Sequence, residues 1–450
     1  MNWLEVAKNY REEFIELTTK LLQIPTVLEA YDPSNLEEPF GKEIREALDM
    51  MLNYGKKDGF LVKNIDNYAG HIEYGTGEEV LGILGHLDVV PAGGKWDNPP
   101  FSAIQKDGKI YARGAMDDKG PTVAAYLALK MIKDKGIKLN KKVRIILGCD
   151  EETGMRGVLR YLEKERMPDI GFASDAEFPL IYGEKGIYMY DFIAKEKDDI
   201  IKSISAGERY NVVPDECTAI LKKNLSKEFK TFLENNNYQG KIEGKKYTIY
   251  GKNAHAAMPD LGVNAIHLMV DFLKDYSQAK FIQFMDKYLS FDNKGNKLGL
   301  SCYDKEMKGL TNNLAIINYD GENLKIGLNI RYPRNYDFKA GEVKMTEAGA
   351  PYGVKYKYIN HSKPHYVSPE DKLIKSLLSA YQKYSNDTET EIFTIGGGTY
   401  ARRMNKAVAF GALFPGDEEL AHQPNEYLDI DKMIIATAIY AESIELLAGE

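Results

Sequence analysis

The chain has 450 residues, of which 44% are hydrophobic and 28% are charged. This is the composition of a globular protein, and the length predicts two domains or one domain with a large insertion. The formal net charge is −8 and Lys and Arg are scattered, so we expect no nucleic-acid partner. Cys149, Cys217 and Cys302 lie far apart, which argues for a reducing compartment and against a disulfide framework.

Neither end of the chain has the pattern of an export or membrane segment. Charged residues interrupt residues 1–14, where a signal peptide would need an apolar run. The apolar stretch at residues 433–441 has about half of the roughly 20 residues that a membrane-spanning helix needs. We therefore expect a soluble, cytoplasmic protein with no membrane partner.

Helix and strand patterns alternate in the first part of the chain. Apolar residues recur at helical spacing over residues 4–22 and 36–54, and residues 121–132 predict a further helix. Short, mainly apolar runs at residues 80–83 and 143–147 predict buried strands. This alternation predicts an α/β fold with a mostly parallel sheet covered by helices.

The pattern changes after about residue 181 and returns near residue 365. Alternating strands are expected in between, at residues 186–195, 246–250, 313–319 and 324–331, with a helix at 261–276. Asp320-Gly321 predicts a hairpin turn between the last two strands. The α/β elements expected afterwards are a helix at 371–384, strands at 391–395 and 407–410, and a helix at 431–447. We therefore predict one domain from residues 1–182 and 365–450, interrupted by an inserted α+β domain of residues 183–364.

Acidic residues and histidines gather in loops at the ends of the predicted strands, where open parallel sheets hold their sites. These groups are Gly85-His86-Leu87-Asp88, Asp117-Asp118 within residues 114–120, Asp150-Glu151-Glu152-Thr153-Gly154, Ser174-Asp175-Ala176-Glu177 and, far downstream, Ala421-His422-Gln423-Pro424. Imidazole is a common metal ligand, and Asp88 could orient the ring of His86. A lone histidine is more often structural, however, and paired acids are usually a solvated helix start.

Three carboxylates and two imidazoles suit a pair of zinc-like ions better than one ion, because a single catalytic ion needs only three protein ligands. Composition and spacing alone leave the metal site and the structural alternative equally open.

Several motifs in order resemble the co-catalytic zinc peptidases of the aminoacylase, carboxypeptidase and dipeptidase family. They are GHLDVVP at residues 85–91, ARGAMDDKG at 112–120, DEETG at 150–154 and SDAE at 174–177. Within that family the chain is most similar to the bacterial dipeptidase V type, also called Xaa-His or β-alanyl dipeptidases. The motifs that point to this branch are NVVPD at 211–215, GKNAHAA at 251–257 and IGGGTYAR at 395–402.

The resemblance implies two divalent metal ions, with zinc as the expected metal and manganese or cobalt as alternatives. It implies that Asp117 bridges the ions, that His86 and Asp175 hold one of them, and that Glu152 and His422 hold the other. It also implies a cis peptide bond between Asp117 and Asp118.

The implied reaction is hydrolysis of the amide bond of dipeptides by a hydroxide that bridges the metals. Glu151 would be the general base, and Asp88 would orient the ring of His86. The charges agree with this scheme, because three ligand carboxylates and one hydroxide neutralise two divalent cations.

The resemblance further implies that the inserted domain is a lid. His255 would donate to the oxyanion, Asn211 and Arg331 would lie near the scissile carbonyl or the substrate carboxylate, and Gly397, Gly398 and Thr399 would hold a carboxylate with main-chain N–H groups. The plain alternatives are a surface histidine, a solvated strand end and an ordinary tight turn.

The expected partner is a small peptide substrate, and the large lid favours a monomer. An N-acyl amino-acid deacylase or a desuccinylase on the same scaffold is the alternative function. A catalytically inactive relative that binds peptides is a further alternative, although the retained ligands and Glu151 argue against it.

Overall fold

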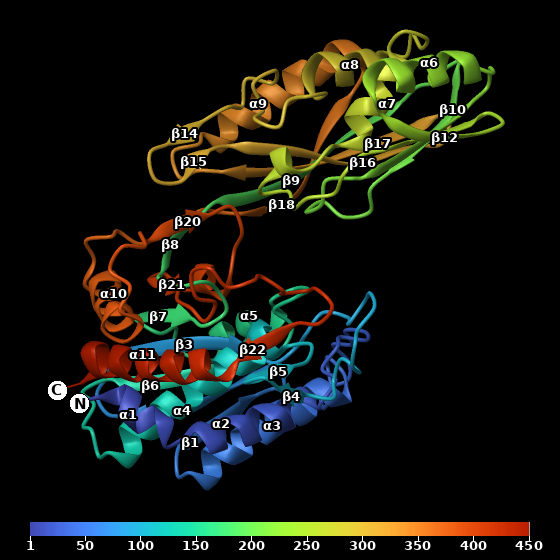
Figure 1. The fold of residues 1–450 in the computed structure, drawn as a ribbon. Coiled ribbons are helices and arrows are strands. Elements are labelled where there is room, and N and C mark those ends of the chain that lie inside the picture. The colour runs from blue at the N-terminus through green and yellow to red at the C-terminus, as the bar shows by residue number, and fades with distance from the viewer. Residues whose placement is uncertain (450) are drawn as a thin grey trace. The chain divides into compact units, whose positions relative to one another are not determined.

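The computed structural model describes residues 1–449 (Figure 1). It divides into two compact units: Met1–Tyr182 with Tyr366–Phe393 and Gly398–Glu450, and Gly183–His365 with Thr394–Gly397. The short segment Thr394–Gly397 groups with the second unit, because the carbonyl of Ile395 accepts the N–H of Lys185 at 2.9 Å.

The first unit is built on a mixed sheet with the strand order β1-β2-β6-β3-β7-β21-β8-β19, and β20 pairs with β8. The strands are β1 (Leu61–Ile65), β2 (Ala69–Gly75), β3 (Val80–His86), β6 (Lys142–Gly148), β7 (Ile170–Ala173), β8 (Ile181–Glu184), β19 (His365–Tyr366), β20 (Phe393–Ile395) and β21 (Ala407–Ala409). The central strands β6, β3, β7 and β21 are mutually parallel, whereas β1, β2 and β8 join antiparallel. The predicted mostly parallel sheet is confirmed, and the antiparallel outer strands are an addition to it.

Helices cover both faces of this sheet (Figure 1). They are α1 (Trp3–Lys8), α2 (Arg11–Leu22), α3 (Lys42–Lys57), α4 (Gly120–Asp134), α5 (Arg156–Lys164), α10 (Lys372–Ser385) and α11 (Ile430–Ala448). The single helix expected at residues 4–22 is two helices, because the side chain of Asn9 donates to the carbonyl of Glu5 and the first helix ends there. The helix expected from residue 36 starts only at Lys42, after Gly41 with φ of 102°.

The central strands are buried on both sides, which explains their mainly apolar sequences. In β3, Ile83 belongs to the main core with α2, α4 and α11, whereas Leu84 belongs to a smaller core with Tyr161 of α5. The sheet is therefore a firmly packed support for the residues that follow its strands.

A small sheet joins two distant parts of the first unit. It contains β4 (Ile104–Lys106), β5 (Lys109–Tyr111) and β22 (Tyr427–Asp429), in the order β22-β5-β4. Leu428 pairs with Ile110, so the loop that precedes β22 lies beside the segment that follows β5. These two segments carry His422 and Asp117.

The second unit is an antiparallel sheet with the order β12-β13-β11-β10-β16-β17-β9-β18 and with helices packed on it. Its elements are β9 (Gly186–Lys195), β10 (Ile201–Ala206), β11 (Glu216–Leu221), α6 (Ser226–Asn236), β12 (Gln239–Glu243), β13 (Lys246–Tyr250), α7 (Ala265–Leu273), α8 (Lys280–Tyr288), β14 (Tyr303–Asp304), β15 (Lys308–Gly309), β16 (Thr311–Tyr319), β17 (Asn323–Tyr332), α9 (Phe338–Gly349) and β18 (Lys355–Ser362). The expected hairpin joins β16 and β17, with Gly321 at φ of 103°. The prediction of an inserted α+β domain is confirmed in its fold.

Within residues 1–449, no helix combines the length and the apolar character that crossing a membrane requires.

Candidate metal centre

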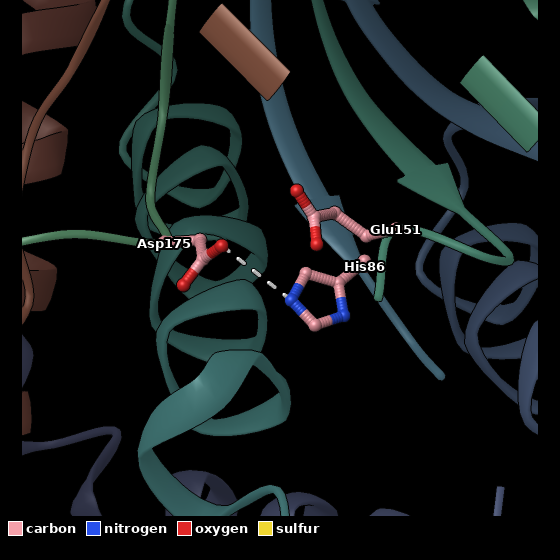
Figure 2. A group of neighbouring side chains, drawn as sticks. All are labelled: His86, Glu151 and Asp175. Carbon is pink, nitrogen blue, oxygen red and sulfur yellow. Dashed lines mark ion pairs between the residues drawn. The ribbon is translucent and has the colours of Figure 1, made fainter. Parts of the chain in front are cut away.

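The carboxyl ends of neighbouring parallel strands bring three predicted site residues together. His86 is the last residue of β3, Glu151 follows β6, and Asp175 follows β7. Because β3 lies between β6 and β7, these ends share one edge of the sheet. In Figure 2 the carboxylates of Glu151 and Asp175 both lie close to the His86 ring, and Asp175 Oδ2 is 3.6 Å from His86 Nε2.

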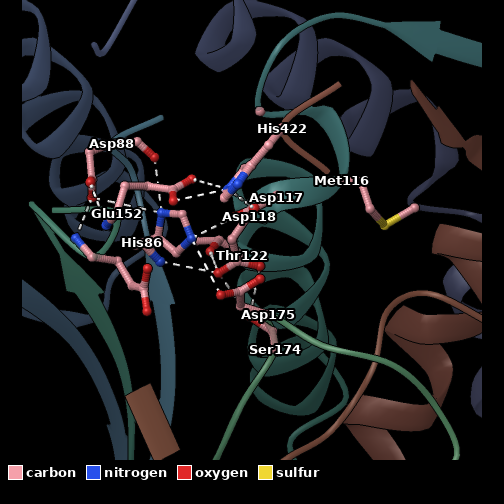
Figure 3. Close-up of polar contacts among 12 residues, drawn as sticks. His86, Asp88, Met116, Asp117, Asp118, Thr122, Glu152, Ser174, Asp175 and His422 are labelled. Carbon is pink, nitrogen blue, oxygen red and sulfur yellow. Dashed lines mark hydrogen bonds and ion pairs between the residues drawn. The ribbon is translucent and has the colours of Figure 1, made fainter. Parts of the chain in front are cut away.

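Asp117 lies between two histidines. The short helix η1 (Ala115–Lys119) presents it, with Oδ1 at 2.9 Å from His86 Nε2 and Oδ2 at 3.0 Å from His422 Nε2. His422 Nε2 also lies 3.0 Å from Glu152 Oε2 (Figure 3). The Asp117–Asp118 peptide bond is cis, as the resemblance implied. The structure therefore brings all five predicted ligands into one cluster.

Two sets of ligand atoms are close enough to hold a metal ion. The atoms of His86, Glu151 and Asp175 all lie within 4.8 Å of one another, and so do those of His86, Asp117 and Glu152. Glu151 is thus as near to a potential ion as the expected ligands are.

The charges of the cluster fit a cation. Burial raises the pKa of Glu151 well above its ordinary value and that of Glu152 to about 7, so these carboxylates resist ionisation unless positive charge lies beside them. Contacts with Asp117 and Glu152 raise the pKa of His422 to about 10, because the acids favour the charged ring. Divalent cations would supply that positive charge, and mixed carboxylate and imidazole ligands suit zinc, manganese or cobalt.

A buried lysine close to the cluster does not neutralise it. Lys119 is fully buried, and its Nζ donates to the carbonyls of Leu21 at 3.1 Å and Ile24 at 2.8 Å. The lysine ties the η1 segment to the end of α2 and donates away from the carboxylates.

The carboxylate of Asp88 binds the acidic loop at residues 150–152, whereas the main-chain carbonyl of Asp88 contacts the His86 ring. Its carboxylate accepts the main-chain N–H groups of Asp150 at 2.6 Å, Glu151 at 3.0 Å and Glu152 at 3.2 Å. The ring nitrogen Nδ1 of His86 lies 2.9 Å from the Asp88 main-chain carbonyl and 3.7 Å from its carboxylate. The carbonyl oxygen is therefore the group that fixes the ring, with Nδ1–H donating.

Two buried acids of the site were missing from the predicted set. The carboxylate of Asp118 accepts hydrogen bonds from the N–H of His86 at 3.1 Å and from the hydroxyl of Thr122 at 3.0 Å (Figure 3). Glu426, four residues after His422, accepts bonds from the segment that carries Asp117. In the sequence, only the short distance along the chain from Asp118 to Asp117 and from Glu426 to His422 marks these two acids. A solvated acid can occupy the same positions.

The predicted lid residues Asn211 and His255 are neighbours within the second unit. The N–H of Ala256 donates to the carbonyl of Asn211 at 2.9 Å, and Val212 pairs with His255 in an antiparallel bridge. The N–H of Ala257 approaches His255 Nδ1 at 3.4 Å, which favours the tautomer with hydrogen on Nε2.

Arg331 is buried, which excludes the alternative of a solvated strand end. It is 4% exposed, and its guanidinium donates to Asn329 Oδ1 at 2.8 Å and to the carbonyl of Gly396 at 3.0 Å. It therefore supports the start of the glycine loop that contains Gly397.

The rest of that glycine loop belongs to the first unit. Gly398 and Thr399 start this part, and the Thr399 hydroxyl accepts the N–H of Ala401 at 3.1 Å as the cap of a short helix, η4 (Tyr400–Arg403). The loop is therefore more than a tight turn, since it also begins a helix.

Comparisons with known proteins point to a peptidase family. Residues 82–446 match Peptidase family M20/M25/M40. A protein from Staphylococcus saprophyticus that carries a provisional dipeptidase name is 39% identical over 470 residues, which cover all of both chains.

Solved structures share the fold. Human carnosine dipeptidase 1 superposes with a TM-score of 0.61 at 16% identity, over 99% of this chain and 98% of that one. A protein from Bacillus subtilis, described as a dinuclear metal-binding peptidase of the M20 family, gives a TM-score of 0.52 at 11% identity over 97% and 98% of the chains. With the family match over most of its length and a relative that is 39% identical over the whole chain, the chain belongs to Peptidase family M20/M25/M40.

Proposed function

We propose that this chain is a metal-dependent dipeptidase of the dipeptidase V type that binds two divalent ions, with zinc as the expected metal. The observation that carries the proposal is the clustering of His86, Asp117, Glu152, Asp175 and His422, with Glu151 beside them. The provisional dipeptidase name of a relative 39% identical over its full length supports the substrate class.

Each ligand has a distinct task in this proposal. Asp117 contacts both histidines with separate oxygens, so it is the residue suited to bridge two ions. His86 with Asp175 would hold one ion, and Glu152 with His422 would hold the other. When bound, such cations act as Lewis acids that acidify water and polarise the scissile carbonyl.

Glu151 would move the proton. Its carboxylate lies beside His86 and Asp175, and burial raises its pKa, which makes the carboxylate a better proton acceptor. In the proposed reaction a Glu151 oxygen takes a proton from water and returns it to the nitrogen of the leaving amine. Asp88 would fix the orientation of Glu151 through the main chain.

Residues of the second unit and the glycine loop would select short substrates. We propose that His255 donates to the oxyanion through Nε2, as its tautomer allows. Asn211, Arg331 and the main-chain N–H groups of Gly397, Gly398 and Thr399 would bind the substrate, the glycine loop by its terminal carboxylate. A fixed carboxylate anchor leaves room for one residue on the leaving side, which favours dipeptides, and the large inserted lid would let a monomer act.

An N-acyl amino-acid deacylase or a desuccinylase would use the same metal ligands and the same base. The test is a panel of dipeptides, N-acetyl amino acids and N-succinyl amino acids, assayed after reconstitution with zinc, manganese or cobalt. We expect the highest kcat/KM on dipeptides. Higher values on either acylated series would assign the chain to that rival.

A chelator separates an enzyme from an inactive peptide-binding relative. Turnover should disappear when metal is removed and return when it is restored. Peptide binding without any chelator-sensitive turnover would refute the proposed function.

A further inference from the structure

Glu426 is a fully buried carboxylate that joins two loops of the metal centre. Its Oε1 accepts the main-chain N–H of Met116 at 2.9 Å and of Asp117 at 3.2 Å. Its Oε2 accepts the N–H of Gly114 at 3.1 Å and Nη1 of Arg113 at 2.6 Å. Both oxygens are therefore used, and all four donors belong to the segment that carries Asp117.

The main chain at Glu426 adds a fifth contact to the same segment. The carbonyl of Glu426 accepts the N–H of Ala112 at 3.0 Å. Glu426 also lies four residues after His422, so whatever fixes Glu426 limits where the His422 loop can lie. A single residue thus links the segments of Asp117 and His422, which are 3.0 Å apart at Asp117 Oδ2 and His422 Nε2.

Arg113 extends this contact to a third loop. It is 1% exposed, it pairs with Glu426, and its Nη2 donates to the carbonyl of Ala92 at 3.0 Å. Its guanidinium carbon lies 5.3 Å from the centre of the Trp96 ring. The ion pair is therefore enclosed by protein, where removal of one partner leaves the other charge uncompensated.

We infer that Glu426 is a positioning residue of the metal centre, which sets the spacing of Asp117 and His422 and thereby the affinity for metal. The inference rests on the proposed metal-dependent function. Glu426 acts without touching the ion or the substrate. Its main effect should fall on metal binding, because a carboxylate that orients ligands typically changes metal affinity about 10- to 100-fold when it is replaced.

The test compares two buried ion pairs by substitution of one acid in each. Glu426→Gln keeps the shape but turns an N–H₂ group toward main-chain N–H donors. Glu73→Gln is the matched control, because Glu73 is 7% exposed and pairs with Nε of Arg144 at 2.6 Å, on strands β2 and β6 and outside the ligand cluster. Metal-free wild type and both variants are titrated with Zn²⁺ and, separately, with Mn²⁺ by calorimetry, and their melting temperatures are measured without metal.

We expect Glu426→Gln to bind metal about 10- to 100-fold more weakly than wild type. Glu73→Gln should lower the melting temperature and leave the metal affinity within about threefold of wild type. Equal affinity in wild type and Glu426→Gln would overturn the inference, and so would an equal loss of affinity in both variants, since that loss would be one of general stability.

A shorter acid provides a second test if Glu426→Gln does not fold. Glu426→Asp retains the charge but cannot reach both pairs of N–H donors, so its metal affinity should lie between those of wild type and Glu426→Gln. Wild-type affinity in a folded Glu426→Asp would then overturn the inference. Wild type that binds metal and cleaves no dipeptide would refute the proposed function alone and leave this comparison of affinities valid.

Discussion

The carboxylate of Asp88 accepts the main-chain N–H of Glu151 at 3.0 Å, so an acid at the end of one strand holds the proposed base at the end of the next. The same carboxylate holds Asp150 and Glu152. Three N–H donors on one buried acid fix the acidic loop as a unit.

Replacement of Asp88 by asparagine should loosen that loop. One carboxylate oxygen becomes an N–H₂ group that faces N–H donors, so at least one buried donor loses its acceptor. We expect kcat/KM on a dipeptide to fall about 10- to 100-fold. Steady-state kinetics and metal titration of the purified variant check this.

Asp198 is the matched control for Asp88. It is 7% exposed and accepts the N–H groups of Ile200 at 2.9 Å and Ile201 at 2.6 Å, but it belongs to the second unit. Asp198→Asn should lower stability with little change in kcat/KM. A similar loss of activity in both variants would show that Asp88 has no special role in the site.

Glu151→Gln should bind metal and scarcely turn over. The amide keeps the size of the side chain but cannot accept a proton from water, and loss of a general base typically costs about 10²- to 10⁴-fold in rate. The measurements are kcat on a dipeptide and metal content of the purified variant. Glu177→Gln, at an exposed acid two residues after Asp175, should keep near-normal kcat. Near-normal turnover in Glu151→Gln would remove Glu151 from the mechanism.

The sequence predicted those elements whose pattern is set by burial. Strands β9 and β13 have the expected bounds, and each contains a run of three buried residues. Strand β1 was not predicted, because it is mostly exposed and has no such run.

The proposed ligands could be named from the sequence, but the residues that position them could not. Motifs after strands marked His86 and Asp175. The roles of Asp118 and Glu426 depend on hydrogen bonds to segments remote in the chain, with Glu426 and Asp117 separated by 309 positions. A buried acid that accepts several N–H groups has the same sequence signature as a solvated one, so only the tertiary structure distinguishes them.

His71 should make the first unit less stable in acid. Burial, with the nearby charge of Arg144, lowers the pKa of His71 from 6.5 to about 4, and the ring lies 2.9 Å from the Tyr161 hydroxyl through Nδ1. Between pH 6.5 and pH 4 the unfolded chain binds this proton and the folded chain does not. Stability is therefore present above pH 6.5 and is lost as the pH falls toward 4, by up to roughly 3 kcal/mol.

The variant His71→Asn tests this pH dependence. Asparagine can place an acceptor near the position of Nδ1 but does not titrate, so the free energy of unfolding should be lower at pH 7 and fall less steeply toward pH 4.5. Chemical denaturation of wild type and variant across that range gives the difference between their free energies of unfolding. The acid sensitivity of the metal centre is common to both proteins and cancels in this difference. Parallel pH profiles would mean that the ring is not held neutral in the fold.

Arg331→Lys tests the proposed substrate anchor. Arg331 donates to the carbonyl of Gly396, so lysine, a single-point donor, should disturb the glycine loop as well as any direct contact with substrate. We expect KM for a dipeptide to rise about 10-fold, with a smaller change in kcat. This rise corresponds to the loss of one hydrogen bond to a charged group, worth roughly 1.5 kcal/mol.

The same dipeptide as its C-terminal amide should be a poor substrate of wild type. Arg331→Lys should raise the KM for this amide little further, because the carboxylate that the anchor binds is already gone. Arg334→Lys is the control on the same segment, since Arg334 pairs with Asp304 and Glu306, and its KM should stay near that of wild type. Equal losses on the dipeptide and its amide would show that Arg331 acts on the loop alone and not through the substrate carboxylate.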